Sequence, residues 1–269
     1  MIELRDISFS YDNSHDNSYD KAPALADISL NIEQGESVSL LGSNGSGKST
    51  LLKLLNGLIF ADSGTYRFDG EEITKKRLED ERFAKLFHQR MGFIFQNSDT
   101  QLFCADVYDE IAFGPRQMGH AEAEVRERTE DLLELLHLKG FEHRQPYHLS
   151  GGEQRKVALA AVLSMNPDVL VLDEPMNGLD PKTERWLAEF LVRLNESGKT
   201  IILSTHNIGL VQEISKRSIL FSEDHRIVAD LETARLLDDI DLLKQVNLVD
   251  QYYHKHESKD HSHFHIHNY

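Results

Sequence analysis

The chain has 269 residues, with 29 Lys and Arg against 45 Asp and Glu, so its net charge is −16 when histidine is neutral. This balance argues against a protein that coats nucleic acid or holds anionic lipid through its own basic patch, since both depend on Lys and Arg. The single cysteine, Cys104, excludes an intramolecular disulfide and fits a reducing compartment.

No stretch of the sequence approaches the ~20 mostly apolar residues that a membrane-spanning helix needs. The first ten residues, MIELRDISFS, carry acids and lack the basic and then apolar pattern of a signal peptide. We therefore expect a cytoplasmic chain that reaches a membrane only through other proteins.

Strands and helices alternate along most of the chain, which predicts an α/β fold with a largely parallel sheet covered on both faces. Alternating apolar residues indicate the first two strands, and a polar, turn-rich loop separates them. Short apolar runs followed by helical patterns indicate the later strands. The expected strands are 2–9, 25–32, 37–41, 168–172 and 200–204, the loop is 12–23, and helices are expected to begin at about 47, 182 and 208.

Three segments differ from this α/β pattern. A charged region rich in Glu and Leu, at about 100–165, predicts an inserted helical subdomain. Residues 231–253 show a helical pattern, and residues 254–269 form a His-rich tail that we expect to be flexible. The expected organisation is a main domain over 1–230, a helical extension and this tail.

Residues 42–49 read GSNGSGKS and fit the pattern G-x-x-x-x-G-K-[ST] between an apolar strand and a helix. Glycines let successive N–H groups point inward, and the helix adds its positive N-terminal end, so a phosphate loop is predicted. We expect Lys48 to reach the β- and γ-phosphates and the Ser49 hydroxyl to bind Mg²⁺. The alternative is a glycine-rich turn without a ligand. The candidate nucleotide-binding residues are Gly42, Ser43, Asn44, Gly45, Ser46, Gly47, Lys48, Ser49 and Thr50.

A second apolar strand, in VLVLDEP at 169–175, ends in two acids. Ligands of open α/β sheets bind at the carboxyl ends of the strands. We expect Asp173 to hold Mg²⁺ through water and Glu174 to polarise the water that attacks the phosphate. The alternative is a helix N-cap or a solvated turn, which Pro175 favours.

The sequence LSGGE at 149–153, followed by QRKVALA, resembles the signature of ATP-binding-cassette (ABC) ATPases, usually written LSGGQ, from which Glu153 departs. Further motifs of this family follow one another in the family's order over about residues 2–230. They are Tyr11, the phosphate loop, Gln96 in FIFQNSD, the signature, the acidic strand end, Asp180 in NGLD and His206 in STHN.

The resemblance implies a P-loop NTPase core with an antiparallel β subdomain and an inserted helical subdomain. It also implies a head-to-tail dimer, of this chain or with a related ATPase, in which ATP and Mg²⁺ lie between one phosphate loop and the partner's signature. The roles that it implies are adenine stacking for Tyr11, contact with Mg²⁺ or the attacking water for Gln96, γ-phosphate binding across the dimer for Ser150, Gly151 and Gly152, interface contacts for Asp180, and γ-phosphate binding with orientation of the water for His206.

Ordinary structural roles are the alternatives for these residues. Tyr11 at a strand end could pack on the core, and His206 could be structural. Gln96 could be a plain polar loop residue. Ser150 and Asp180 could simply cap the helices that follow them.

Residues 96–119 resemble the ATPase subunits of energy-coupling-factor importers, and LSGGE with QRKVALA is similar to their cobalt- or nickel-uptake type. The resemblance implies integral membrane coupling and substrate-binding subunits as partners. One membrane helix would enter a groove bordered by Gln96 and the loop after it. It places the chain at the cytoplasmic face of the cell membrane. Importers of vitamins share much of this sequence and remain an alternative.

The tail carries histidines at alternate positions, and neutral imidazoles are good ligands for Ni²⁺ and Co²⁺. A solvated tail without function is the alternative. The candidate metal ligands are His254, His256, His261, His263, His265 and His267.

Two further hypotheses come from other classes. A non-transport ABC ATPase acting on DNA or ribosomes predicts a coiled-coil insertion, basic arms or two cassettes, and the sequence has none of these. A metal store with a vestigial ATPase conflicts with intact Lys48, Asp173, Glu174 and His206.

Overall fold

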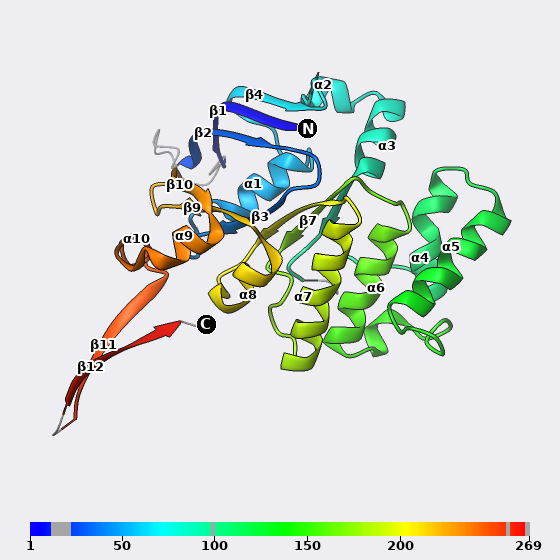
Figure 1. Cartoon of the computed structure of the whole chain (residues 1–269). Coiled ribbons are helices and arrows are strands. Elements are labelled where there is room, and N and C mark those ends of the chain that lie inside the picture. The colour runs from blue at the N-terminus through cyan, green and yellow to red at the C-terminus, as the bar shows by residue number, and fades with distance from the viewer. Residues whose placement is uncertain (12–22, 98–99, 257–258, 267–269) are drawn as a thin grey trace. The chain divides into compact units, whose positions relative to one another are not determined.

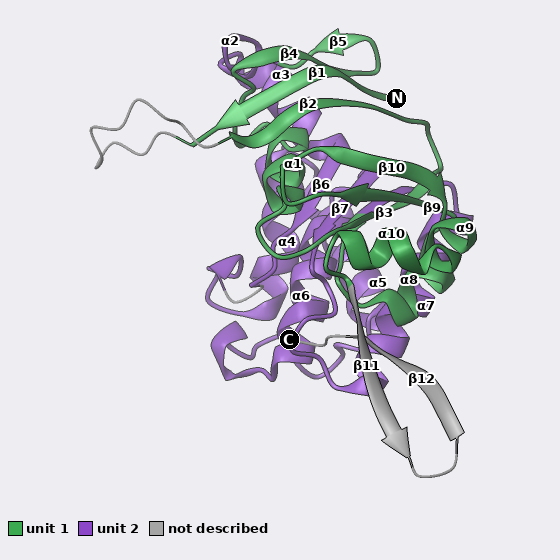
Figure 2. Ribbon diagram, turned by 90° about the vertical axis from the view of Figure 1, so that its left-hand side faces the viewer, with its two compact units in different colours: residues 1–73, 203–269 green, residues 74–202 purple. Residues whose placement is uncertain are grey.

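The computed structural model of the chain describes residues 1–11, 23–97, 100–256 and 259–266, and from residue 249 onward it describes the backbone alone (Figure 1). The chain forms two compact units: residues 1–73 with 203–269, here unit 1, and residues 74–202, here unit 2 (Figure 2). Helices alternate with strands that pair in parallel within each unit, so the predicted α/β class is confirmed.

Unit 1 contains an antiparallel sheet with the strand order β2-β1-β4-β5, the β subdomain that the resemblance implied. The alternation that predicted its long strands reflects one buried face, since Ile2 and Leu4 are buried. A bulge at Asp6, whose φ is 52°, returns Ile7 to the buried side. The strands are β1 (Ile2–Ser10), β2 (Pro23–Ile32), β4 (Ser63–Phe68) and β5 (Glu71–Glu72).

Unit 1 also contains the strand that leads into the phosphate loop. Strand β3 (Ser37–Leu41) pairs in parallel with β9 (Arg217–Phe221), which pairs in antiparallel fashion with β10 (Ile227–Glu232). Every residue of β3 is buried, as expected of an apolar run in a covered sheet. Helix α1 (Lys48–Leu55) follows β3 through the phosphate loop.

Three short helices near the C-terminus complete the core of unit 1. Leu41 and Leu220 of the strands pack in one buried cluster with Val211, Leu236 and Leu243 of the helices. Burying such a side chain stabilises the fold by ~1.5–3 kcal/mol, so these helices contribute directly to the stability of unit 1. They are α8 (Ile208–Ile214), α9 (Thr233–Asp238) and α10 (Ile240–Gln245).

Unit 2 combines a parallel strand pair with most of the helices. Helix α4 packs on α5 and α6, and these three lie where the sequence predicted a helical insertion. The strands are β6 (Met91–Ile94) and β7 (Val169–Asp173), and β8 (Thr200–Ser204) leads the chain back into unit 1. The helices are α2 (Lys75–Leu78), α3 (Glu81–Arg90), α4 (Val107–Gln117), α5 (Glu122–Leu135), the 3₁₀ helix η2 (Pro146–His148), α6 (Gly151–Leu163) and α7 (Pro181–Glu196).

The C-terminal segment begins with helices α9 and α10, within the expected helical extension, and continues as two strands. Helix α10 ends at Gln245, and the backbone of β11 (Val249–His256) then pairs with β12 (Lys259–Ile266) as an antiparallel hairpin. The tail histidines recur at every second residue, and a repeat of two residues is also the period of a β-strand. The side chains of all six tail histidines lie outside the described part of the chain.

In the part of the chain that the structure describes, no helix is both long and apolar enough to span a bilayer.

Candidate functional site

The phosphate loop takes a backbone path that only glycine permits at two positions. Gly42 and Gly47 have φ values of 149° and 109°. A Cβ at Gly42 would lie 2.9 Å from the carbonyl oxygen of Phe221, and one at Gly47 would lie 2.5 Å from that of Ala24. Gly47 is also the left-handed N-cap of α1, so it turns the chain from the loop into the helix. The spacing of the glycines is therefore a steric requirement of this turn.

The Lys48 side chain folds back onto the phosphate loop. Its Nζ donates hydrogen bonds to the carbonyl oxygens of Gly42 (2.7 Å) and Ser43 (2.9 Å), and the residue is only 6% exposed. A buried ammonium needs such acceptors, because an unsatisfied buried charge is very costly. The ammonium is thus held at the centre of the loop, beside the N-terminal end of α1, where an anion is favoured.

Two serine hydroxyls of the loop fit a phosphate ligand. Within the described residues, the Oγ atoms of Ser43 and Ser46 are buried and make no hydrogen bond. A buried polar group without a partner costs about 1–3 kcal/mol, and such groups mark places where a ligand supplies the missing acceptor. Phosphate oxygens are acceptors of this kind. The donors of the loop therefore suit the phosphates of ATP.

Tyr11 and His206 belong to the same unit as the loop. The Tyr11 and Thr50 hydroxyls lie 3.4 Å apart, which ties the tyrosine to α1. Its ring meets Phe9 edge-on at 4.9 Å and stays 44% exposed, so it combines the packing role with an accessible aromatic face. The N–H group of Thr205 donates to the Leu40 carbonyl at 3.2 Å, which places the start of the His206 segment at the end of β3.

The two acids at the end of β7 are buried, and one has an unusual backbone. Asp173 and Glu174 are less than a tenth exposed, and Glu174 has a φ of 45°. The other non-glycine residues of the described chain with positive φ are all Asp, Asn or His, which tolerate this conformation best. The helix after this turn begins only at Pro181, so Glu174 is no helix N-cap. Strain at a buried acid is typical of functional positions.

The signature forms the N-terminus of α6 through a capping box. The Ser150 hydroxyl accepts from the Glu153 N–H (3.4 Å) and donates to the Glu153 carboxylate (2.7 Å), which also accepts from the Ser150 N–H (2.7 Å). These hydrogen bonds hold the pKa of Glu153 below its usual value. The departure from LSGGQ therefore has a structural role, and the N-cap alternative for Ser150 describes its contacts within this chain.

The start of α7 packs closely on the signature. A Cβ at Gly152 would lie 3.3 Å from the side chain of Thr183, whose hydroxyl donates to Asp180 at 2.5 Å. Asp180 caps α7 by accepting from the Lys182 and Thr183 N–H groups, as the second alternative predicted. The Thr183 hydroxyl and these N–H groups lower the pKa of Asp180. Signature and NGLD turn are thereby joined within one unit.

The predicted site residues thus form two groups, each positioned within its own unit. Unit 1 holds Tyr11, residues 42–50 and His206, and unit 2 holds Gln96, residues 150–152, Asp173, Glu174 and Asp180. The oxygen atoms of Ser49, Gln96 and Asp173 are of the kind that Mg²⁺ prefers beside phosphate. Their roles remain predictions.

Sequence reasoning missed three buried or half-buried polar residues around Gln96. They are Gln101, Glu110 and Arg155, which hydrogen-bond to the backbone on either side of Gln96 or further along its loop. The available signal was weak: Arg155 is a charged residue one turn into a helix that otherwise buries Val157, Ala158 and Leu159.

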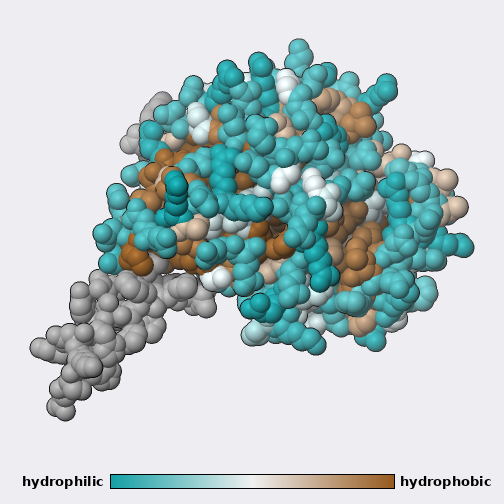
Figure 3. Space-filling view, in the orientation of Figure 1, coloured by the Kyte–Doolittle hydropathy of each residue, from teal (hydrophilic) through white to brown (hydrophobic). Residues whose placement is uncertain are grey.

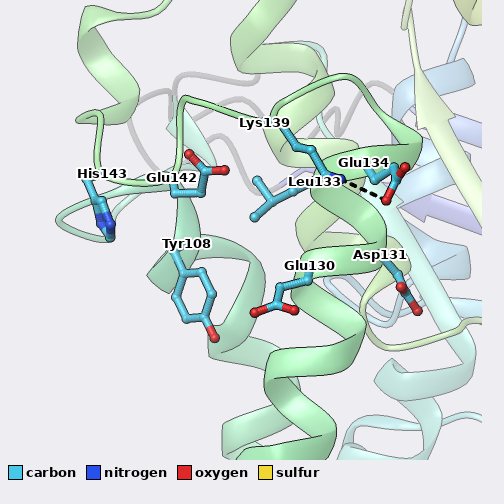
Figure 4. Close-up of a pocket in the computed structure, with 8 residues that line it drawn as sticks. All are labelled: Tyr108, Glu130, Asp131, Leu133, Glu134, Lys139, Glu142 and His143. Atoms are coloured by element: carbon cyan, nitrogen blue, oxygen red, sulfur yellow. Dashed lines mark hydrogen bonds and ion pairs between the residues drawn. The ribbon is translucent and has the colours of Figure 1, made fainter.

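A hollow of about 510 Å³ in unit 2 has carboxylates as half of its lining residues (Figure 4). One of them is engaged, since Lys139 Nζ lies 2.9 Å from the Glu134 carboxylate. Among the described residues no group of three or more His, Cys, Asp or Glu side chains could hold a metal ion. The lining residues are Tyr108, Glu130, Asp131, Leu133, Glu134, Lys139, Glu142 and His143.

Comparison with known proteins agrees with this geometry. The family model described as "ABC transporter" matches residues 25–177. A putative ABC transporter ATP-binding protein of Clostridium acetobutylicum is 47% identical, over 93% of this chain and 100% of its own length. The nickel import ATP-binding protein LarO of Lactiplantibacillus plantarum is 44% identical, over 88% and 95%. The structure of cbiO1 from Clostridium perfringens, part of the ABC transporter complex cbiONQ, aligns with a TM-score of 0.77 and 31% identity, over 92% of this chain and 94% of that one.

The glycine geometry gives a matched pair of substitutions. Gly47→Ala places a Cβ 2.5 Å from a backbone oxygen at a φ of 109°, so we expect a loss of at least ~2 kcal/mol in unfolding free energy and of ATP binding. Gly45→Ala has a φ of 83° but nothing within 4 Å, so we expect a cost of only ~1 kcal/mol. Thermal denaturation and binding of a fluorescent ATP analogue measure both. Equal effects of the two substitutions would contradict the steric argument.

Proposed function

Since the chain belongs to the ABC transporter family of ATP-hydrolysing proteins, we propose that it is the ATPase subunit of an energy-coupling-factor importer for nickel or cobalt ions. The phosphate loop carries the ATP part of this proposal, because Lys48, two serine hydroxyls and the end of α1 converge there. Similarity to a nickel import protein over most of both chains, together with the resemblance of residues 96–119 to this importer type, supports the transport part.

ATP hydrolysis is proposed to take place in a head-to-tail dimer, of two copies or with a related ATPase. The phosphate loop and Tyr11 of one subunit bind ATP, and the Ser150–Gly152 backbone of the other contacts the γ-phosphate. Glu174 polarises the attacking water and His206 orients it. Bound Mg²⁺, held by Ser49, Gln96 and Asp173, would neutralise phosphate charge. Phosphoryl transfer depends mainly on such positioning and charge stabilisation, so turnover requires the closed dimer.

A hydrophobic hollow of unit 2 suits the proposed membrane partner. It measures about 200 Å³ and is lined by His88, Phe93, Phe103, Phe113, Val162 and Met165, among others. We call it the docking groove, and Figure 3 shows apolar residues gathered on the face that carries α4 and α6. Phe103 is 67% exposed and meets the Phe113 ring edge-on at 4.9 Å. So large an exposed aromatic pair is typical of an interaction surface.

A buried carboxylate holds this aromatic pair in place. Glu110, on α4, accepts hydrogen bonds from the N–H groups of Phe103 (2.9 Å) and Cys104 (2.7 Å). Burial and the same carboxylate raise the pKa of the Cys104 thiol to about 11, so Cys104 is no nucleophile at neutral pH. The loop is therefore preorganised to present Phe103. The occupant we propose is an amphipathic helix of an integral membrane coupling subunit at the cytoplasmic face.

The His-rich tail is proposed to bind the transported metal ion as a local store. This part rests on the sequence, because the side chains of residues 254–269 lie outside the described part of the chain. Imidazoles at alternate positions offer several nitrogen ligands to Ni²⁺ or Co²⁺.

Replacing the proposed base tests the ATPase mechanism. Glu174→Gln keeps the size of the side chain but removes the negative charge that polarises water, so we expect phosphate release to fall at least ~100-fold. ATP binding should persist, and a dimer should accumulate in size-exclusion chromatography with ATP. Glu134→Gln, a surface change in the same unit, is the control. Hydrolysis at the wild-type rate in Glu174→Gln would show that another group polarises the water.

The docking groove has its own test. Phe103→Asp puts a charge into the apolar surface, so we expect loss of the detergent-extracted complex with the membrane coupling subunit. The ATPase activity of the free chain should stay within ~2-fold, because Phe103 is not one of the residues proposed to bind ATP or Mg²⁺. Leu135→Asp, on α5 and 53% exposed, is the matched control outside the groove. Complex formation by Phe103→Asp at the wild-type level would refute the groove as the docking surface.

Removing the tail separates metal binding from ATP hydrolysis. Truncation after Tyr253 should lower the number of Ni²⁺ or Co²⁺ ions bound in isothermal titration calorimetry and leave ATPase activity unchanged. Unchanged metal binding would leave the tail without this role and favour the vitamin-importer alternative.

A further inference from the structure

One buried side chain of unit 2 binds two successive backbone carbonyls at the end of β6. The strand ends at Ile94, so the carbonyls of Phe95 and Gln96 lie beyond its paired residues. The Arg155 guanidinium donates to both, at 2.7 Å to Phe95 and 2.6 Å to Gln96. A guanidinium has donors on both terminal nitrogens in a rigid plane, so one side chain fixes the orientation of two neighbouring peptide groups.

Because Arg155 is buried, its guanidinium cannot readily exchange these two carbonyls for water. Arg155 is 4% exposed, and a buried cation without hydrogen-bond acceptors is strongly disfavoured. Hydrogen bonds from a charged donor are also stronger than neutral ones. Loss of the two carbonyls would therefore leave a buried charge poorly satisfied. Arg155 and the Gln96 backbone should move together.

A second side chain also holds this segment. The Phe95 N–H group donates to Oε1 of Gln101 at 3.2 Å, and Nε2 of Gln101 donates to the Phe93 carbonyl at 3.1 Å. The Gln101 amide thus takes the place of a neighbouring strand. With Arg155 on the carbonyl side, both polar groups of Phe95 are engaged immediately before Gln96.

The other end of this connection is the signature. Arg155 lies one turn into α6, whose first residues carry the Ser150 capping box and the close Gly152–Thr183 contact. We infer that Arg155 is a positioning residue that couples the Gln96 loop rigidly to the signature helix. Movement of that loop by a partner is then transmitted to Ser150. This inference rests on the proposed functions of Gln96 and the signature.

The effect of Arg155 should be on turnover and not on nucleotide affinity. Arg155→Gln removes both hydrogen bonds, so we expect kcat of the dimeric ATPase to fall at least ~10-fold. The Kd of the monomer for an ATP analogue should stay within ~2-fold, because the phosphate loop and Tyr11 belong to unit 1. Arg155→Lys can still reach one carbonyl and should rescue kcat in part.

Arg128 provides the matched control. It donates to the Ser164 carbonyl at the opposite end of α6 (3.2 Å) and to Glu124 (2.6 Å). Arg128→Gln therefore also removes a guanidinium that contacts α6, and it should lower Tm without lowering kcat. If Arg155→Gln reduces kcat no more than Arg128→Gln does, the inference is wrong. Should Arg155→Gln fail to fold, wild-type kcat in Arg155→Lys overturns it equally.

A double-mutant cycle with Gln96→Ala separates the proposed role of Arg155 from that of Gln96. If Arg155 acts through Gln96, Arg155→Lys should change kcat by less than ~2-fold once Gln96 is replaced. Fully multiplicative effects would refute the coupling and leave the role of Gln96 intact. If Gln96→Ala alone leaves kcat unchanged, the proposed role of Gln96 fails first, and the inference for Arg155 fails with it.

Discussion

The contact between the Lys48 ammonium and the carbonyls of Gly42 and Ser43 is the constraint on which the nucleotide site depends. It requires a backbone that curls around a cation, and this curl is open only to glycine at positions 42 and 47. The loop must also be anchored at both ends, which the fully buried β3 and the helix α1 provide. The sheets and helices of unit 1 thus serve to hold one positive charge where phosphate can meet it.

Unit 2 is organised around the N-terminus of α6. Ser150 and Glu153 cap it, Gly152 permits the close approach of α7, and Arg155 reaches the Gln96 backbone. Lys156 adds a cation–π contact, with its Nζ 4.5 Å from the centre of the Trp186 ring on α7. Five residues at the start of one helix therefore connect three sequence motifs. Short-range packing therefore holds the family motifs of unit 2 in place. Some of the residues that do this, such as Arg155, lie outside the motifs themselves.

The sequence predicted those parts of the molecule whose cause is local. The phosphate loop, the buried strands β3 and β7 and the cap residues Ser150 and Asp180 follow from spacing, apolar runs and capping preferences within a few residues. Strands β4 and β9 were missed because they are short and pair with strands far away in the chain. Arg155 was missed for the same reason: the carbonyl groups that it binds lie 60 and 59 residues earlier in the chain.

The backbone of Glu174 has a consequence for the evolution of this chain. A left-handed conformation costs a residue with a side chain about 1 kcal/mol more than glycine, and here a buried Glu bears that cost. Selection for thermal stability alone would favour Glu174→Gly, which relieves the strain and deletes the carboxylate. Under the proposed role of Glu174 as the base, the turn after β7 is therefore a point where selection for stability and selection for turnover oppose each other.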